Sequence, residues 1–293
     1  MSDSLPLRDL CDLAIKAAQE AGQFIQTAAT DSIDINFKDA GSSEASQLVT
    51  AVDIRSEAII RERLKVISEE WGIAFVGEES SPILDSIAAE RLRADYFWSV
   101  DPLDGTLAFV QGRPGYAVSI ALVTQSGKPL LGVVYDPVGA TLIYAIERGG
   151  VYREPPSCGN ENISTEALVV FSDASLKTHT QYEAVCKALN DCALNVGLDG
   201  VTWVYGNGAV KNACQVVDHS SACYVKLPKE EQGGGSIWDY AATACIAIES
   251  GRWASNIHGD PLELNRSEST FMNHQGVLYA SNEKIARFLI DAL

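Results

Sequence analysis

The sequence has few residues that bind soft metals, and those that it has are scattered. Its seven cysteines include no Cys-x-x-Cys pair, and its four histidines include no His-x-x-x-His pair. Both spacings are typical of zinc sites, so the pattern argues against a zinc enzyme. An odd number of isolated cysteines is typical of mostly buried thiols in a reducing compartment.

The chain also lacks a long apolar run and an excess of basic residues. No apolar stretch approaches the ~20 residues that span a bilayer, and the first residues, Met1-Ser2-Asp3-Ser4-Leu5-Pro6, do not have the pattern of a signal peptide. We therefore expect a cytoplasmic protein. Lys and Arg number 22 against 39 Asp and Glu, and the net charge of -17 disfavours nucleic-acid polymers and membranes as partners. Bound divalent cations would offset this charge if the substrate is itself an anion.

The remaining composition is that of a globular protein with a sizeable core. The 293 residues are 46% hydrophobic and 21% charged, which suits one large domain or two closely joined lobes. We expect an N-terminal metal-binding lobe over residues 1–158 and a C-terminal substrate-recognition lobe over residues 159–293.

The apolar patterns predict an α/β fold. Residues 116–124, 130–135 and 141–146 are apolar stretches with short Gly- and Pro-containing connections, which predicts an antiparallel meander. Beyond Cys158 strands and helices alternate, which indicates layered α/β structure. The other predicted elements are helices at 8–29, 54–71, 178–190, 207–217 and 238–250, strands at 33–37, 73–76, 168–172, 194–196, 222–227 and 277–280, and a loop at 38–47.

The central stretch is Tyr96 to Thr106, in which an apolar strand runs into Asp101-Pro102-Leu103-Asp104-Gly105-Thr106. Two carboxylates three positions apart on a turn can converge on a hard cation, and oxygen ligands favour Mg²⁺. A surface turn is an alternative, because Asp, Pro and Gly are ordinary turn residues. Haloacid dehalogenase-type phosphatases carry Asp-x-Asp-Gly-Thr after a strand, but here two residues separate the acids, so the spacing disfavours that class.

Three further acids lie at the ends of predicted elements. Asp53 stands where an N-cap belongs, Glu78 follows the strand at 73–76, and Asp239 lies in the first turn of a helix after Gly233-Gly234-Gly235. Each has a structural interpretation alone: a cap, a solvated pair with Glu79, and an acid that complements the helix dipole. Five acids at strand ends and helix starts together predict an assembled site.

In chain order, Val49-Thr50-Ala51-Val52-Asp53, Gly77-Glu78-Glu79, Asp101-Pro102-Leu103-Asp104-Gly105-Thr106 and Trp238-Asp239 resemble the motifs of one family. This is the lithium-sensitive, Mg²⁺-dependent phosphomonoesterase family of hydrolases, which includes inositol monophosphatase and 3'(2'),5'-bisphosphate nucleotidase. The match runs from about Leu48 to Ser281. The resemblance implies a sugar-phosphatase-like αβαβα sandwich.

The resemblance also implies two or three Mg²⁺ ions and a role for each motif residue. Its implied ligands are Glu78, Asp101 and the Leu103 carbonyl for one ion, Asp101, Asp104 and Asp239 for a second, and Asp53 with Glu78 for a third. It implies Glu78, Thr106 and Asp53 as catalytic residues that orient a metal-activated water, with no covalent intermediate. The implied substrate contacts are Asp104, Gly105, Thr106 and Asp239.

The C-terminal region points to one branch of the family. Residues 256–262 and 271–278 resemble the bisphosphate nucleotidases, including the CysQ type. Inositol enzymes usually carry an acid shortly before Trp-Asp, where this chain has Gly234, Gly235 and Ser236. Lys211 lies near the position of a nucleotidase lysine and would face a second phosphate, and a solvated helix lysine is an equal alternative.

We therefore expect hydrolysis of the 3'-phosphate of adenosine 3',5'-bisphosphate or of 3'-phosphoadenylyl sulfate. An inositol monophosphatase, or another phosphatase of small sugar phosphates, is the alternative. A relative that binds metal and nucleotide without catalysis is a second alternative. The expected partner is a small phosphorylated substrate, and because relatives include monomers and dimers, a homodimer stays open.

Overall fold

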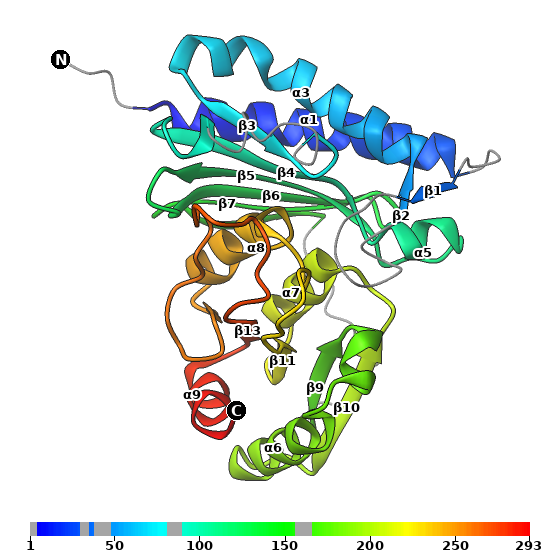
Figure 1. The fold of residues 1–293 in the computed structure, drawn as a ribbon, viewed down its shortest axis with the longest axis vertical. Helices are drawn as coiled ribbons and strands as arrows, with labels where there is room; N and C mark the ends of the chain where they lie inside the picture. The colour runs from blue at the N-terminus through cyan, green and yellow to red at the C-terminus, as the bar shows by residue number, and fades with distance from the viewer. Residues whose placement is uncertain (1–4, 30–34, 38–47, 81–89, 156–165) are drawn as a thin grey trace.

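The computed structural model describes residues 5–29, 35–37, 48–80, 90–155 and 166–293, and these form five stacked layers of helices and sheets (Figure 1). Two sheets alternate with three helical layers, and this confirms the predicted αβαβα sandwich. The layers are joined by three apolar clusters, one on each outer side and one between the sheets.

The first sheet has six strands in the order β3-β4-β5-β6-β7-β8. Strand β3 is parallel to β4 and every later pair is antiparallel, so the predicted meander is confirmed. Helices α1 and α3 cover its outer face (Figure 1). The bounds are α1 Leu7–Ala28, α3 Ala51–Trp71, β3 Ala74–Gly77, β4 Tyr96–Asp104, β5 Ala117–Thr124, β6 Pro129–Asp136, β7 Thr141–Ile146 and β8 Gly150–Glu154. A short pair, β1 Ile35–Phe37 and β2 Leu48–Thr50, is antiparallel.

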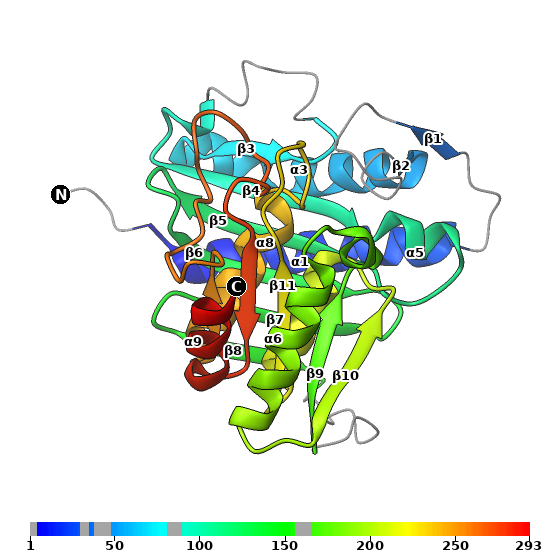
Figure 2. The ribbon, with the colours of Figure 1, turned by 60° about the horizontal axis from the view of Figure 1, so that its bottom comes forward.

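The second sheet has five strands in the order β10-β9-β11-β13-β12. Strands β9, β10 and β11 are parallel to one another and lie side by side (Figure 2), and β13 is antiparallel to both of its neighbours. Helices α6 and α9 cover the outer face of this sheet. The bounds are β9 Ala167–Ser172, α6 Tyr182–Asn195, β10 Gly200–Tyr205, β11 Ala222–Lys226, β12 Trp253–Ser255, β13 Val277–Ala280 and α9 Glu283–Ala292.

The middle layer consists of α7 (Ala209–Asp218) and α8 (Ile237–Glu249), which lie between the two sheets. Helix α8 is apolar on nearly every side, which is the pattern of a helix that is buried all round. A Cβ at Gly132 of β6 would overlap the backbone of Ala242, so glycine is what lets α8 approach the first sheet. The middle cluster takes side chains from both sheets.

Some predicted elements differ from the structure. The strand predicted at 194–196 is wrong, because α6 continues through Asn195 and the following strand is β10. Asp53 is not an N-cap, because α3 begins at Ala51 and places Asp53 in its first turn. The loop at 38–47, residues 33–34 and the boundary at 158/159 lie outside the described residues, and the division into two lobes stays a prediction.

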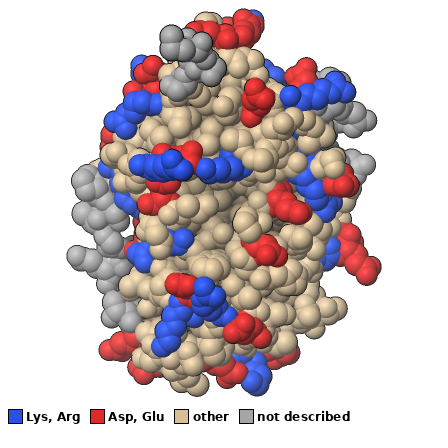
Figure 3. Space-filling model, turned by 90° about the vertical axis from the view of Figure 1, so that its left-hand side faces the viewer, with Lys and Arg blue, Asp and Glu red and all other residues tan. Residues whose placement is uncertain are grey.

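On the face shown in Figure 3, basic side chains lie next to acidic ones. In the described part of the chain, none of the helices combines the length and the apolarity that crossing a membrane requires.

Candidate metal centre

The two central acids lie on an irregular end of β4 rather than on a turn that follows it. The pairing of β4 with β5 shifts register between Asp101 and Asp104, where Pro102 has no N–H to donate. The Asp101 Oδ1 accepts a hydrogen bond from the Leu103 N–H at 3.0 Å. Gly105 follows with φ of 87°, and a Cβ there would lie 2.8 Å from the Gly115 carbonyl oxygen. Glycine is therefore required where the chain leaves the strand.

Carboxylate oxygens of Asp101, Asp104 and Asp239 lie within 4.8 Å of one another. All three side chains are buried, and they come from β4 and from the first turn of α8. A buried set of oxygen ligands suits a hard divalent cation such as Mg²⁺, since zinc and copper sites use sulfur or nitrogen. The residues present therefore fit the metal that the sequence predicts, and these three carboxylates would hold it.

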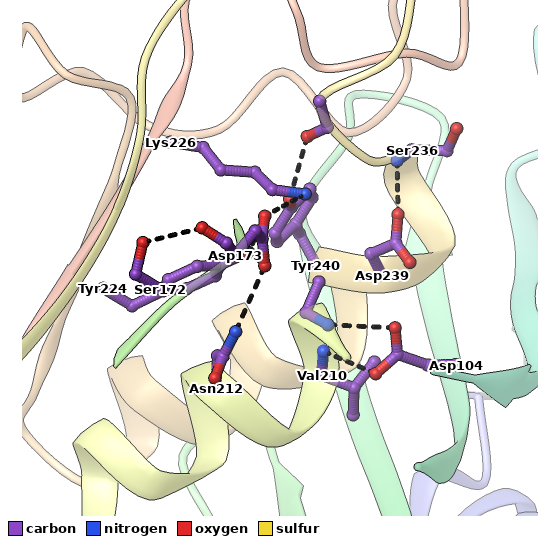
Figure 4. A network of polar contacts seen from close by, with 12 residues as sticks. Asp104, Ser172, Asp173, Val210, Asn212, Tyr224, Lys226, Ser236, Asp239 and Tyr240 are labelled. Atoms are coloured by element: carbon purple, nitrogen blue, oxygen red, sulfur yellow. Dashed lines mark hydrogen bonds and ion pairs between the residues drawn. The ribbon is translucent and has the colours of Figure 1, made fainter. Parts of the chain in front are cut away.

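Asp104 is held by the N-terminus of α7. Its Oδ1 accepts a hydrogen bond from the Ala209 N–H at 3.0 Å and its Oδ2 one from the Val210 N–H at 2.9 Å (Figure 4). These are N–H groups that have no partner within a helix. A Cβ at Gly208 would overlap the Asp104 carboxylate, so only glycine leaves room for it. Sequence reasoning did not detect this contact, because backbone donors leave no side-chain pattern.

Asp239 is fixed by the start of α8. The Ser236 N–H donates to its Oδ2, and the Ser236 side chain completes a capping box (Figure 4). Gly235 has φ of 81°, and a Cβ there would lie 2.7 Å from the Asp239 Oδ2 and 2.5 Å from the Tyr240 hydroxyl. The glycine run before α8 thus allows the chain to pass close to this carboxylate.

The three carboxylates strongly favour a bound proton or cation. Burial and the charge of Glu78 raise the pKa of Asp101, and burial and the charge of Asp239 raise the pKa of Asp104. Burial and Glu78 also raise the pKa of Asp239 to about 6, although Lys226 acts in the opposite direction. Like charges that are buried together repel one another, and a divalent cation would relieve that repulsion.

Glu78 and Asp53 approach this cluster from the first sheet and from α3. The Glu78 N–H donates a hydrogen bond to the Val100 carbonyl at 3.0 Å. This bond holds the residue that follows β3 beside β4. Asp53 is buried, and its Oδ1 lies 2.8 Å from the Thr106 Oγ1. The Thr106 hydroxyl also lies 3.1 Å from the Leu103 carbonyl. Asp101, Asp104 and Asp239 are the predicted acids whose oxygens lie together, whereas Glu78 and Asp53 lie outside that group. The individual roles of all five acids stay predictions.

Lys211 is neither solvated nor unpaired. Its Nζ lies 2.5 Å from the Asp136 Oδ2, and the two side chains are 18% and 16% exposed. The interpretation as a solvated helix lysine is therefore wrong. A contact between Lys211 and a substrate phosphate stays a prediction.

A second cation, Lys226, was not predicted. It ends β11 and its Nζ lies 2.9 Å from the Oδ2 of Asp173, which directly follows β9 (Figure 4). The carboxyl ends of adjacent parallel strands lie at one edge of a sheet, where α/β folds bind ligands. That rule would have identified both residues if the pairing of β9 with β11 had been known.

The fold and the cluster define a class, namely layered α/β proteins with a buried oxygen-ligand site for divalent cations. The sequence model of the inositol monophosphatase family matches residues 7–293, and the chain belongs to this family of phosphatases. A 3'(2'),5'-bisphosphate nucleotidase CysQ of Salmonella typhimurium is 32% identical over 230 residues, which are 77% of this chain and 82% of that protein. Inositol monophosphatase 2 of Solanum lycopersicum is 30% identical over 259 residues, which are 88% of this chain and 91% of that protein.

Solved structures share the fold. The inositol monophosphatase from Anabaena superposes with a TM-score of 0.69 at 22% identity, covering 99% of this chain and 98% of that one. SaIMPase-II bound to 2'AMP superposes with a TM-score of 0.67 at 20% identity, covering 97% of this chain and 93% of that one. The family explains why the predicted motifs occur in this order.

Proposed function

We propose that the protein is a Mg²⁺-dependent phosphomonoesterase that removes the 3'-phosphate of adenosine 3',5'-bisphosphate or of 3'-phosphoadenylyl sulfate. The observation that carries this proposal is the buried cluster of Asp101, Asp104 and Asp239, whose oxygens lie within 4.8 Å of one another. The similarity to bisphosphate nucleotidases supports the choice of substrate.

When bound, Mg²⁺ would supply positive charge to the phosphoryl oxygens and make water a stronger nucleophile. The chain itself fixes the ligand carboxylates: α7 holds Asp104 and the capping box holds Asp239. The Thr106 hydroxyl lies between Asp53 and the Leu103 carbonyl, where it can donate a hydrogen bond to either oxygen. Thr106 is therefore placed to accept a hydrogen bond from a water in turn and to orient that water.

An inositol monophosphatase, or another phosphatase of small sugar phosphates, is the second candidate. The Solanum lycopersicum relative supports it, since its match extends over 88% of this chain. Inositol phosphates carry hydroxyls where a bisphosphate nucleotide carries a second anion, so the two candidates require different polar groups beside the acid cluster.

Substrate competition tests the proposal. We would compare kcat/KM for adenosine 3',5'-bisphosphate, inositol 1-phosphate and fructose 1,6-bisphosphate, with and without Mg²⁺. We expect Mg²⁺-dependent phosphate release and a preference for the nucleotide. A tenfold preference for either sugar phosphate would reject the nucleotide assignment, and no release from any substrate would indicate a non-catalytic relative.

A variant pair links activity to the cluster. Asp101→Asn removes one charge from the cluster and should lower turnover at least ~100-fold, because less charge is available to hold the cation. Asp191→Asn changes an exposed acid that pairs with Lys187 on α6 and should leave turnover unchanged. A normal rate in Asp101→Asn would place the chemistry elsewhere.

A further inference from the structure

Helix α3 carries a second buried acid, Glu57, one turn after Asp53. The Glu57 side chain is only 6% exposed, although glutamate is rarely buried unless it has a partner. Residues four apart on a helix lie on one face, so Glu57 faces the first sheet as Asp53 does. It is not one of the acids that the sequence motifs identify, and its burial therefore needs a separate cause.

The Glu57 carboxylate fills the space that a side chain at Gly77 would occupy. A Cβ on Gly77, the last residue of β3, would lie 2.2 Å from the Glu57 Oε2. The same oxygen accepts a hydrogen bond from the Glu79 N–H at 2.8 Å. Glycine at position 77 thus lets a carboxylate of α3 reach the backbone of the turn that follows β3.

Glu78 is held on both sides by this arrangement. Its own N–H donates to the Val100 carbonyl of β4 at 3.0 Å, and the next N–H, that of Glu79, donates to Glu57. Since peptide units are planar, the two peptide planes that flank the Glu78 Cα are both fixed, and together they set the direction of its side chain. The charge of Glu78 raises the pKa of Asp101 and of Asp239, so its carboxylate acts on the acid cluster from this position.

Helix α3 also contacts the chain where it leaves β4. The Asp53 Oδ1 lies 2.8 Å from the Thr106 Oγ1, so one helix holds the residues that follow β3 and those that follow β4. The other oxygen of Glu57, Oε1, lies 3.6 Å from the Arg61 Nη2, which donates to the Ser80 Oγ at 2.7 Å. Arg61 thus gives the buried carboxylate a cationic partner and ties the end of the same turn to α3.

We propose that Glu57 is a positioning residue of the metal centre, which holds the Glu78 carboxylate beside the acid cluster by accepting the Glu79 N–H. The inference rests on the proposed function, in which Glu78 is a metal ligand. It gives a role to a carboxylate that touches neither the metal nor the substrate. That role depends on the acceptor oxygen of Glu57, because Arg61 already pairs with its charge.

Two substitutions separate the hydrogen bond from the charge. Glu57→Gln removes the charge and keeps an oxygen that can accept from the Glu79 N–H, whereas Glu57→Met removes both from a side chain of similar length. Calorimetric titration with MgCl2 measures the Kd of the cation without turnover. Glu57→Met should raise this Kd about 10-fold to 100-fold, the usual effect of removing a group that orients metal ligands. Glu57→Gln should stay within about threefold of the wild type.

The control Glu62→Met removes an exposed acid from the same helix and should leave the Kd unchanged. Urea denaturation in EDTA measures stability separately. A purely structural role would lower stability in Glu57→Met without changing the Kd, and a purely electrostatic role would raise the Kd equally in both Glu57 variants. Either result would overturn the proposal.

A further variant keeps the test decisive if Glu57→Met does not fold. Gly77→Ala leaves Glu57 in place, but its Cβ forces the carboxylate away from the Glu79 N–H, and it should also raise the Kd for Mg²⁺. An unchanged Kd would overturn the proposal. If the wild type binds Mg²⁺ but releases phosphate from no substrate, the proposed function fails, and the comparison of Kd values still decides the role of Glu57.

Discussion

Neutralising Asp239 should stabilise the metal-free protein while removing its function. In the absence of a cation, the Asp239 carboxylate is buried beside Asp101 and Asp104, and its pKa is raised to about 6. Asp239→Asn replaces the charged group by a neutral one of the same shape. The asparagine keeps an oxygen that can accept from the Ser236 N–H, so the capping interaction can survive.

The size of the effect follows from linkage. The pKa of Asp239 lies near 3.8 in the unfolded chain and is about 6 in the folded protein. The folded state therefore binds more protons between these values, and stability falls as pH rises through them. At 1.36 kcal/mol for each pKa unit, the charge costs about 2 kcal/mol at pH 5 and about 3 kcal/mol at pH 8. Asp239→Asn should recover about these amounts, with the larger gain at pH 8.

Urea denaturation in EDTA at pH 5 and at pH 8 measures both values. The control is Asp9→Asn, which removes an exposed acid from the first turn of α1 without any cluster around it. We expect a small loss of stability there, because an acid near a helix N-terminus is favourable. An Asp239→Asn protein that is no more stable than wild type at pH 8 would refute the interpretation of the cluster as a site of charge repulsion.

Three further predictions concern the same site. Mg²⁺ at 100 times its Kd should stabilise the wild type by ~2.7 kcal/mol, and hence raise Tm by about 5 °C, with reversal by EDTA; an unchanged Tm would contradict the metal centre. Gly208→Ala should reduce this rise in Tm, because the new Cβ overlaps the Asp104 carboxylate. The control Gly200→Ala adds a Cβ with no atom within 4 Å, and it should leave the rise in Tm unchanged. Thr106→Val should lower turnover at least ~100-fold, and Thr106→Ser, which keeps the hydroxyl, should retain most of it; equal rates in the two variants would exclude a role for the hydroxyl.

The sequence alone was enough to place the acids of the cluster in their secondary-structure elements, because local patterns mark the ends of strands and helices. Asp101 and Asp104 end a buried strand, and Asp239 follows a run of glycines, so each could be placed without knowledge of the fold. The meander was predictable for a similar reason, since its connections are short. Asp53 was predicted to cap α3, but the helix begins two residues earlier, at Ala51, so Asp53 lies in its first turn. Sequence patterns do not fix the end of a helix so closely.

The partners of these acids could not be predicted, because they depend on the pairing of distant segments. Asp104 is held by backbone N–H groups of α7, which every non-proline residue carries. Asp173 and Lys226 meet because β11 lies beside β9, with β10 on the other side of β9. The strand predicted at 194–196 shows another limit, since a short apolar run can equally be the end of a helix. Leu194 is in fact 65% exposed.

The hydrogen-bond donors that fix Asp104 and Asp239 are neutral, and this leaves the charge of both carboxylates available to a cation. Backbone N–H groups of Ala209, Val210 and Ser236 fix the carboxylates of Asp104 and Asp239. Neutral donors orient a carboxylate but leave its charge in place, whereas a lysine or arginine would neutralise it and compete with a cation. Lys226 is close enough to act on both acids, yet its salt bridge is with Asp173. The fold thus keeps its nearby cation paired elsewhere, so a metal ion can bind without first breaking a salt bridge.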